Sequence, residues 1–321
     1  MAQVTVFESA GAADASFTIQ TVTSNGVVPT GTNTATYVAA SAASPGVNTP
    51  GNYWDDARFT NASGVQIDDR VGSNLLLSYF AFSEAYAKFQ GGANTPTGAN
   101  LPIYVHWPAG FLEGLVHVVH FSNANQTTPF GSEVALPEAN APYGSWFPAG
   151  NGPHTLNLSF TGVEANAPCV ATLTIFEFAT NLSGTVAAAN GNTNVLLDTR
   201  APDAGELRHV RQITCNGVAD SGGNVTLGLA VTLVSNDDFL NYTFAGTSVN
   251  GAGGGGVDAT ANVPSVQANG AAGNVTVTAS STASVTGVTA TGSVGSPAIR
   301  ADSLITVPSI QGTRAVGTVT A

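Results

Sequence analysis

One alternating segment constrains the fold more than any other feature of the chain. In Val225–Leu233, large apolar residues occupy every second position over nine residues. Successive side chains of a strand point to opposite faces, so this pattern predicts one buried face and one open face. Thr155–Thr161 repeats the pattern with Leu, Leu and Phe, and turn clusters such as Ala189–Asn192 and Ser221–Asn224 separate segments of this kind. The sequence therefore predicts an all-β fold made of β-sandwich or jelly-roll-like domains.

One segment departs from this pattern. Its apolar residues follow steps of four, three, four and three positions: Leu75, Tyr79, Phe82, Tyr86 and Phe89. Such spacing lies on one helical face, and Glu84 and Lys88 form an i,i+4 pair in the favourable order. The alternative is a buried aromatic strand. The spacing favours one amphipathic helix over about residues 74–90, within the first domain.

The composition changes along the chain. All three tryptophans and most phenylalanines precede residue 185, whereas the later part consists mainly of Gly, Ala, Thr and Val. We therefore expect an aromatic-rich β domain over residues 1–185 and a leaner β domain over 186–321. The stretch Ala271–Gly295 has little bulk for a core, so we expect it to rest on a neighbouring sheet or on another subunit. We find weak internal echoes but no fixed period, so the sequence does not predict a solenoid.

The charge balance argues against nucleic acid as a partner. Lys and Arg number 8 against 20 Asp and Glu, which gives a formal net charge of -12. Binding to phosphates needs clustered basic residues, and only Arg208–Arg211 approaches a cluster here. The sequence also shows no membrane span and no signal peptide at Met1–Val6. We expect synthesis in a host cytoplasm.

Motifs for catalysis are missing from the sequence. It has no Gly-x-Ser-x-Gly elbow, no P-loop, no dinucleotide fingerprint and no Cys-x-x-Cys, and it predicts neither an enzyme nor a bound cofactor. His117 and His120 would share one face of a helix, but their surroundings predict a strand. On a strand they point to opposite faces, which argues against a shared metal.

Two further groups of residues suggest weaker sites. Asp237 and Asp238 follow the long alternating strand and could bind calcium, although they lack the spaced acidic pattern and fit an ordinary turn better. Cys169 and Cys215 are expected to be small buried residues, with a disulfide as the less favoured alternative.

Aromatic residues provide the candidates for a sugar site. Tyr53, Trp54, Trp107 and Trp146 could offer ring faces on which sugars stack, and Asp55 and Asp56 could bind hydroxyls. The residues from Tyr53 to Arg58 also fit an ordinary loop anchored by aromatics, and we favour that interpretation for them. Exposure of the rings separates the two.

In general character the chain resembles coat and decoration proteins of bacteriophages, and its two successive β domains resemble the double jelly-roll coats of tail-less phages. A surface rich in Asn, Thr, Ser and Gly is polar without charge, so copies can approach without desolvating ions. The resemblance implies a virion structural protein that assembles with itself as a trimer or larger, and with other virion proteins. The alternatives are an extracellular adhesin or carbohydrate-binding module, and an all-β carbohydrate-active enzyme with two carboxylates roughly 5 to 9.5 Å apart.

Overall fold

The computed structural model describes a chain of β-strands. It describes residues 1–14, 16, 19–26, 33–43, 56–59, 64, 67, 75–80, 83–91, 101–136, 145–148, 150–177, 184–202, 209–234 and 241–252, and, further on, 260–263, 266–268, 276–279, 282–285, 288–290, 298–301, 304–306 and 310–312. None of these residues is helical, which confirms the all-β prediction. The chain divides into two compact units, Met1–Gly254 and Gly255–Ala321.

The first part of the first unit forms two antiparallel sheets. The sheet that we call inner sheet 1 has the order β1 (Gln3–Ala13), β8 (Glu113–Ser122), β3 (Ala35–Ala43), β6 (Ser83–Gly91) and β5 (Leu75–Phe80). Outer sheet 1 has the order β2 (Ile19–Thr23), β7 (Ile103–Phe111) and β4 (Asp56–Phe59).

The second part of this unit forms two more antiparallel sheets. Inner sheet 2 has the order β10 (Ser145–Trp146), β17 (Asn241–Val249), β12 (Pro168–Glu177), β15 (His209–Val218) and β14 (Asn194–Arg200), and β9 (Phe130–Leu136) also pairs with β17. Outer sheet 2 has the order β11 (His154–Phe160), β16 (Val225–Thr232) and β13 (Thr185–Ala188). Numbered from β10, these strands repeat the order of β1 to β8.

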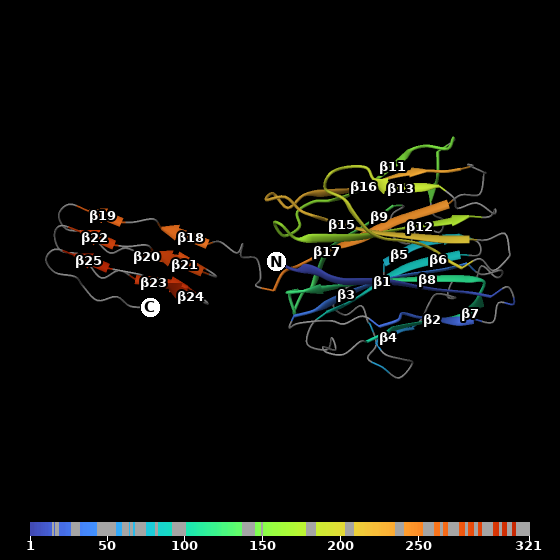
Figure 1. Ribbon diagram of the computed structural model, residues 1–321, viewed down its shortest axis with the longest axis horizontal. Helices are drawn as coiled ribbons and strands as arrows, with labels where there is room; N and C mark the ends of the chain where they lie inside the picture. The colour runs from blue at the N-terminus through green and yellow to red at the C-terminus, as the bar shows by residue number, and fades with distance from the viewer. Residues whose placement is uncertain are drawn as a thin grey trace. The chain divides into compact units, whose positions relative to one another are not determined.

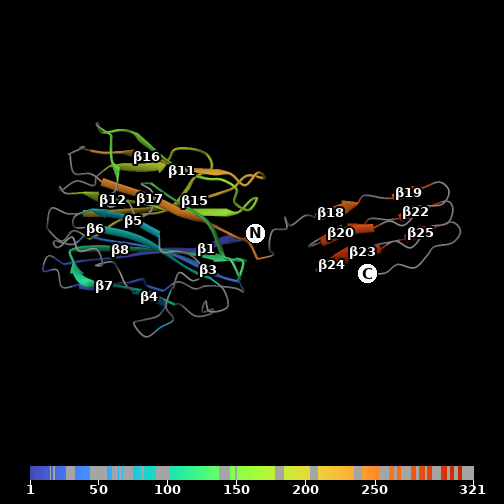
Figure 2. The same ribbon diagram turned by 180° about the vertical axis from the view of Figure 1, so that it is seen from behind.

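The four sheets lie in layers, with the two inner sheets facing each other (Figure 1, and from behind in Figure 2). Each of the three spaces between neighbouring sheets holds its own apolar cluster. Val22 and Trp107 lie between the first pair of sheets, Val119 and Phe176 lie between the inner sheets, and Leu158 lies between the second pair. Burial of apolar side chains is the main stabilising term in folding, so the three clusters together stabilise the first unit.

Position in the stack explains which strands alternate. β11 borders solvent and shows strict alternation of buried and exposed residues, as Thr155–Thr161 predicted. β3 is enclosed on both faces, and all nine of its residues are buried. Its sequence, Ala-Thr-Tyr-Val-Ala-Ala-Ser-Ala-Ala, is accordingly rich in small residues. Close packing between two layers favours such residues.

The helix predicted over residues 74–90 is wrong. Leu75–Phe80 and Ser83–Gly91 form the antiparallel strands β5 and β6, and β6 pairs with β3 along its whole length. The aromatic residues that seemed to lie on one helical face belong to two different strands and to the segment between them. Pairing with a strand distant in sequence overrode this local pattern, as tertiary context often does. The alternative of a strand is therefore the correct one.

Pairing within inner sheet 2 crosses the boundary that the composition suggested. β12 precedes residue 185, and its two neighbours β15 and β17 follow it. Residue 185 itself begins β13. The boundary predicted there therefore lies inside the first compact unit.

The second unit is built from short parallel strands. They form three sheets in the orders β18 (Thr260–Val263), β21 (Thr282–Val285) and β24 (Leu304–Thr306); β19 (Val266–Ala268), β22 (Val288–Ala290) and β25 (Ile310–Gly312); and β20 (Thr276–Ala279) and β23 (Ala298–Ala301).

A constant offset runs through these pairs. Thr260 pairs with Thr282 and Thr282 with Leu304, so each step spans 22 residues. Val266, Val288 and Ile310 show the same step. Parallel strands that repeat at a fixed step form a β-solenoid, so the expectation of no fixed period is wrong.

The period is readable in the sequence once its length is known. Val-Pro-Ser-Val at 263–266 recurs as Val-Thr-Gly-Val at 285–288 and Val-Pro-Ser-Ile at 307–310. Stacking of strands also explains how segments as lean as Thr276–Ala279 and Thr282–Val285 can belong to a folded unit. Each coil packs against the next, so no coil needs a core of its own.

Candidate functional site

The aromatic residues proposed for sugar stacking lie in different settings. Trp107 in β7 is only 2% exposed and packs edge-on against Phe111, with ring centroids 4.9 Å apart. A ring buried to this extent offers no face to a sugar. Trp146 lies in β10, where its backbone pairs with Asn241. Tyr53 and Trp54 lie outside the described residues, as do Asp237 and Asp238, the calcium candidates.

His117 and His120 point to opposite faces of β8, as predicted. The Nδ1 atom of His120 lies 2.8 Å from Oγ1 of Thr36 in the neighbouring strand, on the side of outer sheet 1. The Nδ1 atom of His117 lies 2.8 Å from Oγ1 of Thr214, in β15 of inner sheet 2. Both rings are buried, and they cannot share a metal ion.

His117 belongs to a buried network that joins the two inner sheets. Tyr37 in β3 donates from Oη to Oγ1 of Thr172 at 3.0 Å, and Thr172 lies 2.9 Å from Thr214 through their hydroxyls. Thr172 and Thr214 are direct cross-strand partners in inner sheet 2. The polar side chains between inner sheet 1 and inner sheet 2 are called the seam below.

Burial sets the protonation of these groups. Loss of hydration lowers the pKa of His117 to about 3, although the charge of Asp198 opposes part of this shift. The same loss raises the pKa of the Tyr37 phenol well above its ordinary value, although its bond to Thr172 acts in the opposite direction. A charged form is costly where burial removes most of its hydration. At neutral pH the network therefore contains an uncharged imidazole and an uncharged phenol.

A carboxylate links the two inner sheets at another point of the seam. Glu113 in β8 is fully buried, and its Oε1 lies 3.0 Å from Nδ1 of His209 at the start of β15. The backbone N–H of Val210 donates to Oε2 at 3.2 Å. Both carboxylate oxygens thus bind groups of the opposite sheet, as a buried acid requires.

The charged residue Arg211 is also engaged within the fold. It forms a two-pronged ion pair with Asp198, through Nε at 2.8 Å and Nη2 at 2.6 Å, and Nη1 donates to the carbonyl of Gly184 at 2.8 Å. Its role is to tie β14, β15 and the start of β13 together. The basic stretch Arg208–Arg211 therefore offers no unoccupied Arg211 guanidinium to a phosphate.

The two cysteines are free and buried, in adjacent strands β12 and β15. Loss of hydration raises the pKa of each thiol to about 12. The thiolate is the reactive form, so both groups are inert in the folded chain. This agrees with the interpretation as small core residues.

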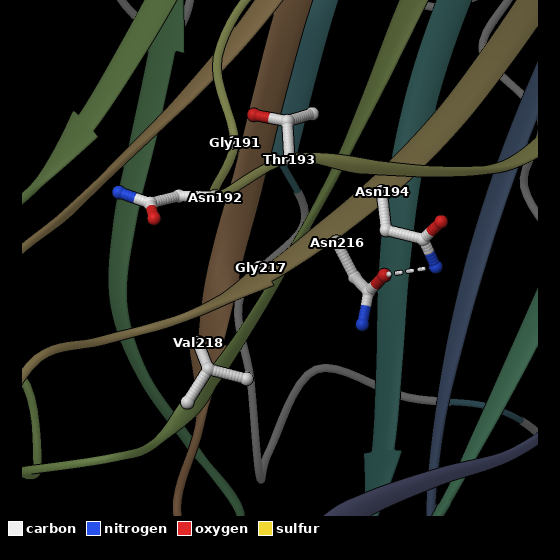
Figure 3. A pocket seen from close by; sticks show the side chains of 7 residues that line it. All are labelled: Gly191, Asn192, Thr193, Asn194, Asn216, Gly217 and Val218. Atoms are coloured by element: carbon white, nitrogen blue, oxygen red, sulfur yellow. Dashed lines mark hydrogen bonds between the residues drawn. The ribbon is translucent and has the colours of Figure 1, made fainter.

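A surface depression near the end of inner sheet 2 provides a polar recess (Figure 3). It encloses about 330 Å³ and is lined by Gly191, Asn192, Thr193, Asn194, Asn216, Gly217 and Val218. The amide of Asn194 donates to Oδ1 of Asn216 at 3.3 Å. None of the lining side chains titrates, so the recess can offer hydrogen bonds but no acid–base catalysis. Sequence reasoning identified Ala189–Asn192 only as a turn.

No group of three or more His, Cys, Asp or Glu side chains suited to a metal occurs within the described parts of the chain. No helix long and apolar enough to cross a membrane is found there either.

The chain was also compared with known proteins. Models of known families, curated proteins and solved structures give no match to it.

Proposed function

We propose that the chain is a virion structural protein, a bacteriophage coat or capsid-decoration protein, and that its first unit consists of two tandem jelly rolls. The strand order carries this proposal. A jelly roll is a long hairpin folded over itself, so strand 1 lies beside strand 8, strand 2 beside 7 and strand 3 beside 6. The pairs β1–β8, β2–β7 and β3–β6 follow this rule.

The second half of the unit supports the proposal independently. Numbered from β10, its strands again pair 1 with 8, 2 with 7 and 3 with 6, as β10–β17, β11–β16 and β12–β15. One departure occurs in both halves, because the fifth strand pairs with the sixth. Jelly rolls recur in viral capsids, and two in tandem suit a coat subunit.

The exposed surface also fits a repetitive assembly. The open face of β11 carries Thr155, Asn157 and Ser159, which are exposed and uncharged. Covering such groups with a neighbouring copy requires no desolvation of ions, which would cost far more. Charged residues of either sign make up only 9% of the whole chain, which limits this cost elsewhere on the surface as well.

The test is the mass of the purified native protein by light scattering, with electron microscopy of the same fraction. We expect trimers, rings or shells whose interfaces bury well over about 1,000 Å² in total. A stable monomer across a wide concentration range contradicts the proposal.

A carbohydrate-binding module is the second candidate, because the recess at Asn192, Asn194 and Asn216 presents neutral amides. Jelly rolls also occur in lectins. A glycan array would show binding that Asn216→Ala abolishes, while Asn157→Ala on β11 serves as control. Monomeric protein with such binding favours this candidate over the coat.

A further inference from the structure

A row of polar side chains crosses the face of inner sheet 2 that points into the seam. Thr174 on β12 is the cross-strand partner of Thr243 on β17 and of Gln212 on β15, and Asn241 lies two residues before Thr243. Alternation places all four on one face, since Phe244 and Ile213 point into the opposite core. All four are fully buried.

Two groups of inner sheet 1 face the same layer. His117 reaches Thr214, which is two residues from Gln212 on β15. Ser41 pairs with Leu115 on β8, two positions from His117, and it is fully buried as well. β15 contacts both β3 and β8. Ser41 and His117 therefore lie on the face of inner sheet 1 that points toward β15.

These six residues lack protein partners for much of their polar surface. The atoms concerned are Ser41 Oγ, His117 Nε2, Thr174 Oγ1, Gln212 Nε2 and Oε1, Asn241 Nδ2 and Oδ1, and Thr243 Oγ1. An unsatisfied buried polar group costs about 1–3 kcal/mol. Eight such groups together would cost as much as a whole domain's stability of about 5–15 kcal/mol. A folded chain must satisfy most of them in another way.

The chemistry of the row selects its occupant. The two amides present donors and acceptors side by side, and the hydroxyls can act as either. Glu113, the carboxylate of the seam, already binds His209 and Val210, and His117 is uncharged at neutral pH. A lone ion would have no counter-charge among these groups. A small neutral molecule that both donates and accepts fits the row.

We infer that ordered water fills this row, bound by Ser41, Thr174, Gln212, Asn241 and Thr243 between the two inner sheets. A buried water typically makes about three hydrogen bonds, so the seven unpaired atoms of these residues, together with Nε2 of His117, correspond to roughly three molecules. The inference is independent of the proposed function. It places a hydrated patch in the layer between the two halves of the first unit, beside the apolar cluster that Val119 and Phe176 belong to.

Water magnetic relaxation dispersion on the full chain tests this inference, because it counts water molecules held for longer than the tumbling time. We expect native protein to show long-lived water that the double variant Thr174→Val, Thr243→Val reduces by at least one molecule. Thr155→Val, the same change on the exposed face of β11, should leave the count unchanged.

Stability provides a second measurement. If water bridges the row, Thr174→Val removes a partner of that water and lowers Tm by a few degrees. In a dry row, the same change removes an unsatisfied hydroxyl at constant volume and raises Tm. Thr174→Ser retains the hydroxyl and should retain the water, even if the double variant fails to fold. An unchanged water count together with a raised Tm for Thr174→Val overturns the inference.

Discussion

The Oη atom of Tyr37 and the Oγ1 atom of Thr172 lie 3.0 Å apart, and the bond between them joins two β-sheets that are distant in sequence. Thr172 passes the connection to Thr214, and Thr214 passes it to His117. The link thus starts on inner sheet 1, crosses to inner sheet 2 and returns. It holds the two halves of the first unit in one alignment.

Removing the phenol oxygen should weaken this alignment. We expect Tyr37→Phe to lower the free energy of unfolding by about 1 kcal/mol, the usual net value of a hydrogen bond. The loss stays moderate because Thr172 keeps its bond to Thr214. Urea denaturation measures the change. Tyr104→Phe, at a partly buried position in β7, is the matched control, because it removes only a longer hydrogen bond of 3.4 Å from Thr21. Equal effects for the two variants would contradict a special role for the seam.

Acid should destabilise the first unit through its two buried histidines. The pKa values of His117 and His120 are lowered by burial from 6.5 to about 3 and about 4. Below pH 6.5, these two histidines therefore bind protons in the unfolded chain but not in the folded chain. The stability from these groups is complete above pH 6.5 and is lost as pH falls toward 4 for His120 and toward 3 for His117. Each histidine contributes up to about 1.4 kcal/mol per pH unit.

Urea denaturation between pH 7.5 and pH 4.5 measures this loss. His120→Gln keeps a group that can bond to Thr36, and should reduce the slope of stability against pH. A slope that neither His120→Gln nor His117→Gln reduces would assign the acid sensitivity to other groups.

Breaking the buried carboxylate contact should have a larger effect than the same substitution at a partly buried position. Glu113→Gln removes the charge that His209 and the N–H of Val210 bind. We expect a loss of about 2–3 kcal/mol, since hydrogen bonds to charged groups exceed neutral ones. Glu133→Gln on β9 provides a partly buried control. No difference between the variants would mean that Glu113 contributes little to the seam.

The thiols should be inert until the chain unfolds. Cys169 and Cys215 are buried, and burial raises their pKa to about 12. A thiol reagent at pH 8 should modify neither in native protein and both in denaturant. Rapid reaction of the native protein, or an intact mass lower by the two hydrogens of a disulfide, would contradict this.

The solenoid offers a prediction based on length alone. Inserting a second copy of residues 279–300 after Arg300 adds 22 residues, the step that separates Thr260 from Thr282. It should preserve the parallel register and leave the rate of proteolysis of this unit unchanged, because coils contact only their neighbours. Inserting residues 279–289 alone adds half a step, and should disrupt the register and speed proteolysis. Equal tolerance of the two insertions would argue against the solenoid.

The sequence predicted the strands that border solvent better than those between layers. Apolar and polar residues alternate in β11 because one of its faces is exposed to solvent, and this pattern is visible in the sequence alone. β3 has no open face, so its run of small residues has no period to read. The aromatic steps of Leu75–Phe89 failed for a related reason, because they ignored pairing with β3.

The candidate site was less predictable than the fold. The opposite orientation of His117 and His120 followed from a strand and was confirmed. The partners of His117, however, are Thr214 and through it Tyr37, which come from strands far apart in the chain. Threonines are common in this sequence, and nothing in their local sequence distinguishes Thr172 and Thr214, the two threonines of this network, from the others. Only the stacking of the inner sheets brings them together.

The enclosure of the inner sheets also sets the order in which the first unit opens. Backbone amides of β3 and β12 lie between cores on both faces and pair with strands on both edges. Local fluctuation of one layer cannot bring them to solvent. Their hydrogens should exchange with deuterium only through global unfolding, whereas those of β13 at the margin of outer sheet 2 should exchange far earlier. The middle of the stack is therefore the part that keeps its hydrogens longest.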